Sequence, residues 1–88
     1  MALADQWDQL TSGLPEGWAE ARVLLALEEA SQIDRAAALL GPLQPFRAGA
    51  GTVSFRVVRS GGEPSGHTAR RLLRGLDAER LHGTLTVV

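Results

Sequence analysis

The glycine-rich segment at residues 61–68 is the stretch of this sequence whose residue types best suit chemistry. Its spacing matches a phosphate-binding loop, except that His67 stands where such loops carry lysine. These loops hold phosphate on the free backbone N–H groups at the start of a helix. Pro64 has no N–H group to offer, and 88 residues are too few for a complete nucleotide-binding domain of this kind. We therefore favour the alternative, a glycine-containing turn in which Ser65 caps the next helix.

An anion site remains open as a second hypothesis for this loop and the helix after it. Its members would be Gly62, Ser65, Gly66, His67, Arg70, Arg71 and Arg74.

His67 and His82 are the only histidines, and the chain has no cysteine. A nucleophile or general base would have to come from one of them with Ser65, Asp77 or Glu79, but no local spacing demands such a group. Two histidines without a clamp such as H-x₃-H do not make a zinc site. The sequence leaves catalysis undecided but favours its absence, and we expect no metal and no cofactor.

All nine basic residues are arginines, and alanine, leucine and glycine are abundant. This composition is typical of a bacterial protein from a GC-rich genome, although arginine also suits phosphate contacts. Residues 1–46 carry seven acidic residues against two arginines, whereas residues 47–88 carry seven arginines against three acidic residues. Such a split indicates either a basic binding surface or two halves that neutralise each other in the fold. We favour the second interpretation.

Binding of nucleic acid is the weaker functional alternative. It would use the arginine-rich half, through Arg56, Arg59, Arg70, Arg71 and Arg74. No aromatic residue lies among these arginines to stack on a base, and the chain has no tyrosine. We favour the simpler explanation, an exposed helix face whose arginines are partly paired with Glu63, Asp77 or Glu79.

Six elements are needed to position these residues. Apolar residues at helical spacing predict helices over 2–11, 31–40 and 68–76, whereas alternation predicts strands over 18–28, 52–59 and 83–88. Residues 18–28 also have the composition of a helix, and we choose a strand because their period is two. We expect Ser31 to cap the second helix and residues 41–51 to form an irregular connection that Phe46 pins to the core.

The order α-β-α-β-α-β predicts an α+β fold with a single domain over residues 1–88. It is a two-layer sandwich, with a three-stranded sheet and all helices on one face. Strand pairing stays open between a parallel sheet in the order 1-2-3 and an antiparallel, ferredoxin-like sheet from which one strand is missing. No apolar run is long enough to span a membrane, so we expect a cytoplasmic protein without membrane partners.

The side of the sheet that faces away from the helices mixes apolar and charged residues, which suits a protein contact. The expected interaction face comprises Trp18, Arg22, Leu24, Arg56, Val58, Thr84 and Thr86. The leading hypothesis is thus a small non-catalytic interaction module whose partner, another protein or a second copy, binds the open face or an edge strand. An anion- or nucleic-acid-binding module is the alternative.

Overall fold

Nine elements make up the parts of the chain, residues 1–59 and 66–88, that the computed structural model describes. They are α1 (Leu3–Ser12), β1 (Glu20–Leu27), the 3₁₀ turn η1 (Ala30–Gln32), α2 (Ile33–Leu39), the 3₁₀ turn η2 (Gly41–Leu43), β2 (Phe46–Gly49), β3 (Thr52–Val58), α3 (Gly66–Ala78) and β4 (Gly83–Val87). Six of these are the helices and strands that the sequence predicts, with ends that differ by up to two residues. β2 and the two 3₁₀ turns are additional.

The strands form one sheet in the order β2-β3-β1-β4, and every neighbouring pair is antiparallel. The α+β prediction is therefore confirmed, and the antiparallel alternative replaces a parallel sheet in the order 1-2-3. After α1, the elements follow the β-α-β-β-α-β sequence of a split βαβ arrangement, as in ferredoxin-like folds. The prediction of three strands is wrong, because the strand that the sequence seemed to lack is β2.

β1 lies at the centre of the sheet and confirms the choice of a strand over a helix. Val23 and Leu25 are fully buried, whereas Glu20 and Arg22 are exposed. Alternate side chains of a strand point to opposite faces, so the period-two pattern places one set in the core and the other in solvent.

β2 falls within the segment predicted as an irregular connection, and Phe46 does not pin that segment to the core. Phe46 is 61% exposed and pairs with Ser54 of β3. All four residues of β2 are exposed, and its register shifts between Arg47 and Gly49. A four-residue edge strand with an irregular register has no buried face, so it leaves no alternating pattern in the sequence.

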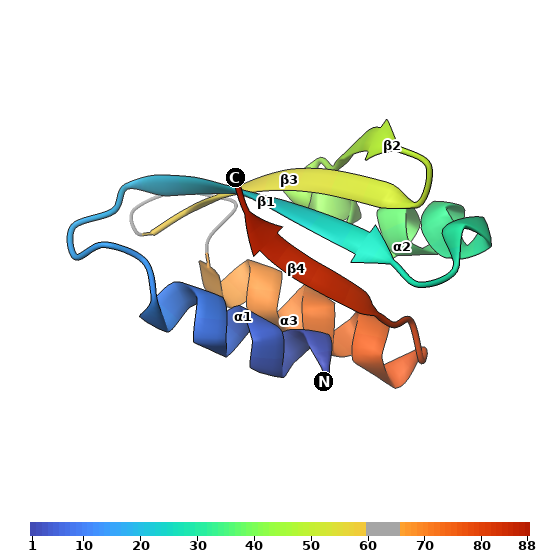
Figure 1. The fold of residues 1–88 in the computed structure, drawn as a ribbon, viewed down its shortest axis with the longest axis horizontal. Coiled ribbons are helices and arrows are strands. Elements are labelled where there is room, and N and C mark those ends of the chain that lie inside the picture. The colour runs from blue at the N-terminus through green and yellow to red at the C-terminus, as the bar shows by residue number, and fades with distance from the viewer. Residues whose placement is uncertain (60–65) are drawn as a thin grey trace.

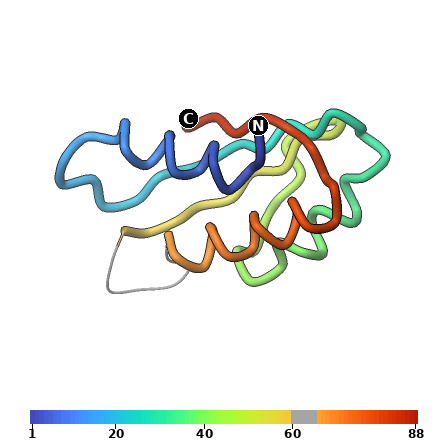
Figure 2. The backbone as a smooth tube through the Cα atoms, turned by 90° about the horizontal axis from the view of Figure 1, so that it is seen from below, coloured from blue at the N-terminus to red at the C-terminus, as the bar shows by residue number. Residues whose placement is uncertain are grey.

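α1 and α3 lie side by side beneath one face of the sheet (Figure 1), and the view from below shows them running along it (Figure 2). α2 contacts α3 and β3, and Ala36 of α2 is buried in the same core. Residues from every layer fill this core, including Leu3, Trp7, Val23, Leu25, Ala36, Phe55, Val57, Leu73, Leu76 and Leu85. The two-layer arrangement with helices on one face is thus present.

The start of α2 differs from the prediction. Residues Ala30–Gln32 form η1, the helix begins at Ile33, and its cap residue Gln32 makes no side-chain capping bond. Ser31 is therefore not the cap, because it lies inside the 3₁₀ turn. The helix itself is only seven residues long.

Side chains far apart in sequence hold α1 in place. Asp77 of α3 accepts hydrogen bonds from the backbone N–H groups of Leu3 and Ala4, at 2.7 and 3.0 Å. The cap residue of α1 is Ala2, which has no polar side chain, so the carboxylate of Asp77 satisfies N–H groups that a local cap would otherwise serve. This contact fixes α1 against α3.

Candidate functional site

The outer face of the sheet points away from α1 and α3, and these helices leave it uncovered (Figure 1). Direct cross-strand partners share a face. The register therefore places these residues on the outer face: Glu20, Arg22, Leu24, Ala26, Phe46, Thr52, Ser54, Arg56, Val58, Thr84, Thr86 and Val88.

Apolar side chains are spread over all four strands of this face. Phe46 is 61% and Val88 is 72% exposed, and Leu24 and Val58 are half-buried. Phe46 and Val88 are two of the three large hydrophobic residues described as exposed in the structure. The sequence-based interaction face lacks Phe46, which only the pairing with Ser54 places there.

Two arginines lie directly opposite each other near the middle of the outer face. Arg22 of β1 is the cross-strand partner of Arg56 of β3. The guanidinium of Arg22 donates a hydrogen bond to Ser54 Oγ at 3.1 Å, and that of Arg56 donates to Glu20 Oε2 at 2.8 Å. Like charges directly opposite one another destabilise a sheet, so their neighbours must offset the repulsion. Glu20 does so for Arg56, whereas the hydrogen-bond partner of Arg22 is an uncharged hydroxyl.

A hollow of about 110 Å³ lies beside these arginines at the start of β2. Its lining comprises Arg22, Leu43, Gln44, Phe46, Ser54, Phe55 and Arg56. Ser54 is only 2% exposed although its side chain is on the outer face. The hollow thus combines two cations, a buried hydroxyl and an exposed aromatic ring.

The other residues of the expected interaction face differ in how far they are exposed to solvent. Thr84 and Thr86 are exposed on β4. Trp18 precedes β1, is half-buried and packs against the hydrophobic core. Trp7 is also in the core, at 4% exposed, as expected for a residue that fills a small core.

The residues of the expected anion site are only partly brought together. Gly62 and Ser65 lie outside the described residues, and Gly66 and His67 begin α3. A groove of about 240 Å³ beside them is lined by Trp7, Asp8, Thr11, Arg59, Gly66, His67 and Arg70. Arg71 and Arg74 are exposed on α3 and are not part of that lining.

The guanidinium of Arg70 is hydrogen-bonded to a carboxylate from α1. Its Nε and Nη2 atoms donate to the two carboxylate oxygens of Asp8, at 2.8 and 3.1 Å. This hydrogen bond and the positive charge lower the pKa of Asp8 below its ordinary value, and the pKa of Arg70 is raised. An incoming anion would have to displace Asp8, so the groove is a poor anion site in this arrangement.

The acidic and basic halves neutralise each other at several points. Four ion pairs join the two halves within residues 1–59 and 66–88, and in three of them the carboxylate comes from the acidic half: Asp8 with Arg70, Glu20 with Arg56, and Asp34 with Arg47. This finding supports the second interpretation of the charge split. Asp77 caps α1, and Glu79 pairs with Arg35 from the acidic half, so neither acts as the predicted partner of the arginines on α3.

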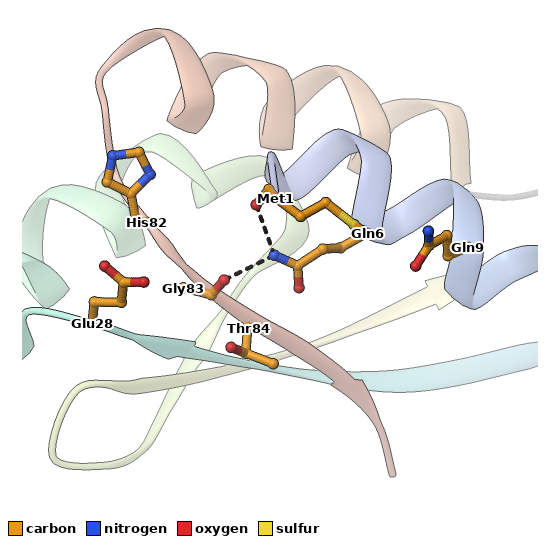
Figure 3. A pocket seen from close by; sticks show the side chains of 7 residues that line it. All are labelled: Met1, Gln6, Gln9, Glu28, His82, Gly83 and Thr84. Carbon is orange, nitrogen blue, oxygen red and sulfur yellow. Dashed lines mark hydrogen bonds between the residues drawn. The ribbon is translucent and has the colours of Figure 1, made fainter.

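The free edge of β4 borders a larger polar hollow of about 410 Å³ (Figure 3). Gln6 extends from α1 over this edge, where its Oε1 accepts from Leu85 N–H at 2.9 Å and its Nε2 donates to Gly83 O at 2.9 Å. The side-chain amide thus takes the place of a neighbouring strand's peptide group. His82 and Glu28 lie at one end of the hollow (Figure 3).

Among residues 1–59 and 66–88, no cluster of three His, Cys, Asp or Glu side chains could hold a metal ion. None of the helices in these ranges has both the length and the apolar character of a membrane span.

No family model, curated protein or solved structure matches this chain.

Proposed function

We propose that this protein is a non-catalytic interaction module and that its outer face docks another protein. The observation that carries the proposal is the exposure of Phe46 and Val88, on a face where Leu24 and Val58 add further apolar surface. Exposed aromatic and aliphatic side chains that share one face are typical of protein contacts. The core does not need Phe46, because this side chain projects into solvent.

Charge favours a different protein over a second copy as the partner. Among the described side chains, the outer face carries Arg22 and Arg56 against one carboxylate, that of Glu20. A twofold contact brings the same patch of both copies together, so it would also bring their arginines together. A partner with acidic side chains among apolar ones complements the outer face better.

The two edges of the sheet differ in a way that agrees with this choice. Gln6 occupies the outward-facing N–H of Leu85 and the C=O of Gly83, so β4 is protected against pairing with a second copy. Proteins commonly protect edge strands against self-pairing in this manner. The outer face has no comparable cover among the described elements (Figure 1).

Site-specific photo-crosslinking in cells, followed by reconstitution, tests the proposal. A photoreactive side chain at Thr86, on the outer face, should capture a partner that the same side chain at Arg71, on α3, does not. The captured protein is then identified, purified and titrated against the wild-type chain, Phe46→Ser and Arg71→Ser. We expect Phe46→Ser to weaken binding by roughly tenfold or more, as for an aromatic residue that becomes buried in an interface, and Arg71→Ser to leave it unchanged.

Two results would contradict the proposal. One is a partner that crosslinks equally from Thr86 and Arg71 and binds Phe46→Ser as tightly as wild type. The other is a concentration-dependent dimer in sedimentation that Phe46→Ser abolishes, because the occupant of the face would then be a second copy.

A further inference from the structure

At Arg56 and Val58, the edge of β3 extends past the first residue of β2 and has no strand beside it among residues 1–59 and 66–88. Arg59 N–H donates to Ala19 O and Leu27 N–H donates to Gly51 O, so the odd-numbered residues of this segment direct their backbone groups toward β1. Alternate residues of a strand direct these groups to opposite edges. The N–H and C=O groups of Arg56 and Val58 therefore point toward the side on which β2 lies.

β2 does not reach these groups. Its first residue, Phe46, pairs with Ser54, and Gln44, two residues earlier, has a φ of +52°, which ends the turn η2 and is not a strand conformation. Within residues 1–59 and 66–88, the backbone groups of Arg56 and Val58 have no backbone hydrogen-bond partner on this edge. An unpaired edge of this kind is a template for another extended chain.

The hollow beside this edge determines which kind of side chain an added strand could place there. A residue placed opposite Arg56 would share the outer face with it, next to the hollow lined by Arg22, Ser54 and Phe46. A guanidinium has five N–H donors, and hydrogen bonds to Ser54 and Glu20 use one terminal nitrogen of each arginine. Donors from both arginines are thus available to a carboxylate.

We infer that the open edge of β3 at Arg56 and Val58 binds an extended, acidic segment of the partner, whose carboxylate enters the hollow between Arg22 and Arg56. This inference rests on the proposed function and names the part of the partner that is recognised. The segment continues the line of β2 along β3. Backbone hydrogen bonds to Arg56 and Val58 supply its alignment, and the arginine pair selects an acidic side chain.

The carboxylate also relieves a strain in the free protein. Arg22 faces Arg56 directly, and among the described residues only Arg56 has a carboxylate partner. A second negative charge between them converts a repulsive cross-strand pair into a bridged one. The same physical argument explains why an uncharged segment would bind less well.

Two synthetic peptides that differ at one position test the inference. The first is the acetylated, amidated heptapeptide Thr-Val-Thr-Glu-Thr-Val-Thr, which places glutamate and two valines on one face of a strand, and the second has glutamine in place of glutamate. Each is titrated into the ¹⁵N-labelled full chain, and amide hydrogen exchange is measured with and without peptide. The variants are Arg22→Gln and, as a matched control on α3, Arg71→Gln, each first shown to keep the wild-type amide spectrum.

We expect the glutamate peptide to slow exchange of the Arg56 and Val58 amides and to bind about tenfold more tightly than its glutamine twin. Arg22→Gln should abolish that preference, whereas Arg71→Gln should keep it. Equal binding of the two peptides, protection at β4 instead of β3, or no binding at millimolar concentration would each overturn the inference.

These outcomes are separable from failure of the proposed function. A captured partner that contacts the outer face without protecting Arg56 and Val58 supports the docking proposal and overturns the strand-addition inference. A partner that contacts α1 and α3 alone overturns the docking proposal. The peptide titration then tests the open edge of β3 independently of that partner.

Discussion

The side chain of Gln6, on helix α1, lies against Leu85 and satisfies two backbone groups of the edge strand β4. Its Oε1 accepts from Leu85 N–H at 2.9 Å, while its Nε2 donates to the carbonyl oxygens of Gly83 and Met1 at 2.9 and 3.0 Å. A primary amide presents the same donor and acceptor as a peptide group. One residue of α1 therefore both attaches the helix to the sheet and protects β4.

Replacing Gln6 with alanine should destabilise the protein and expose the β4 edge. Removing these hydrogen bonds is expected to lower the free energy of unfolding by about 1–2 kcal/mol. Urea denaturation measures this loss, and exchange of the Leu85 amide should accelerate. Gln9→Ala is the matched control, because Gln9 lines the same hollow on the same helix and its side chain makes no recorded bond to β4. Equal effects of the two substitutions would contradict the assigned role.

Asp77 should be required for the start of α1. Asp77→Ala removes the acceptor for the N–H groups of Leu3 and Ala4, which is expected to cost about 1–2 kcal/mol, as for loss of a helix cap. The amide resonances of Leu3 and Ala4 should shift and exchange faster. Asp5→Ala in the first turn of α1 is the control, with an effect of a few tenths of a kcal/mol expected from the helix dipole alone. An unchanged Leu3 amide in Asp77→Ala would refute the capping role.

The ion pair of Asp8 and Arg70 should make stability depend on pH in the acid range. The hydrogen bond from Arg70 lowers the pKa of Asp8 in the folded chain below its ordinary value of 3.8. A group whose pKa is lower in the folded chain stabilises the fold above its unfolded pKa, and this contribution is lost as the pH falls through the folded pKa.

Asp8→Asn tests this dependence directly. At neutral pH the variant should be less stable than wild type in urea, and the difference should shrink as the pH falls below about 4. Asp34→Asn, at another exposed ion pair, is the control for the general effect of removing one negative charge. A wild-type advantage that persists at about pH 2 would show that the pair does not act through the charge of Asp8.

Gly83 should tolerate no side chain, in contrast to Gly75. A Cβ atom at Gly83 would lie 2.5 Å from Ala26 O and 3.0 Å from Leu25 Cδ1, so Gly83→Ala must displace β4 from β1. We expect a loss of about 1–3 kcal/mol, typical of overpacking. Gly75 lies inside α3 with nothing within 4 Å of its would-be Cβ, so Gly75→Ala should gain up to about 1 kcal/mol. Thermal or urea unfolding of the two variants distinguishes these signs.

The sequence predicts the parts of the fold that have a buried face. β1 is recognised because Val23 and Leu25 alternate with exposed residues, even though its composition also suits a helix. β2 escapes prediction because all of Phe46–Gly49 is exposed, and pairing with β3 alone makes it a strand. Phe46 is assigned to the core on its hydrophobicity, but its cross-strand position beside Ser54 puts it on the outer face.

The candidate site is predictable only where it follows from alternation. Arg22, Leu24 and Arg56 are placed on the outer face by period two, and the register confirms their position. The open edge of β3 depends on where β2 begins, which no local pattern reveals. The roles of Gln6 and Asp77 likewise depend on contacts between residues more than 70 positions apart in the chain, so neither residue stands out in the sequence.

The most direct test of the account is chemical-shift mapping of the ¹⁵N-labelled chain with its purified, crosslink-identified partner. Docking on the outer face predicts the largest shifts at the amides of Leu24, Arg56, Val58 and Thr86, with those of Asp5 and Arg71 unmoved. Chemical-shift changes confined to α1 and α3, with no change at the amides of the strands, would contradict the account.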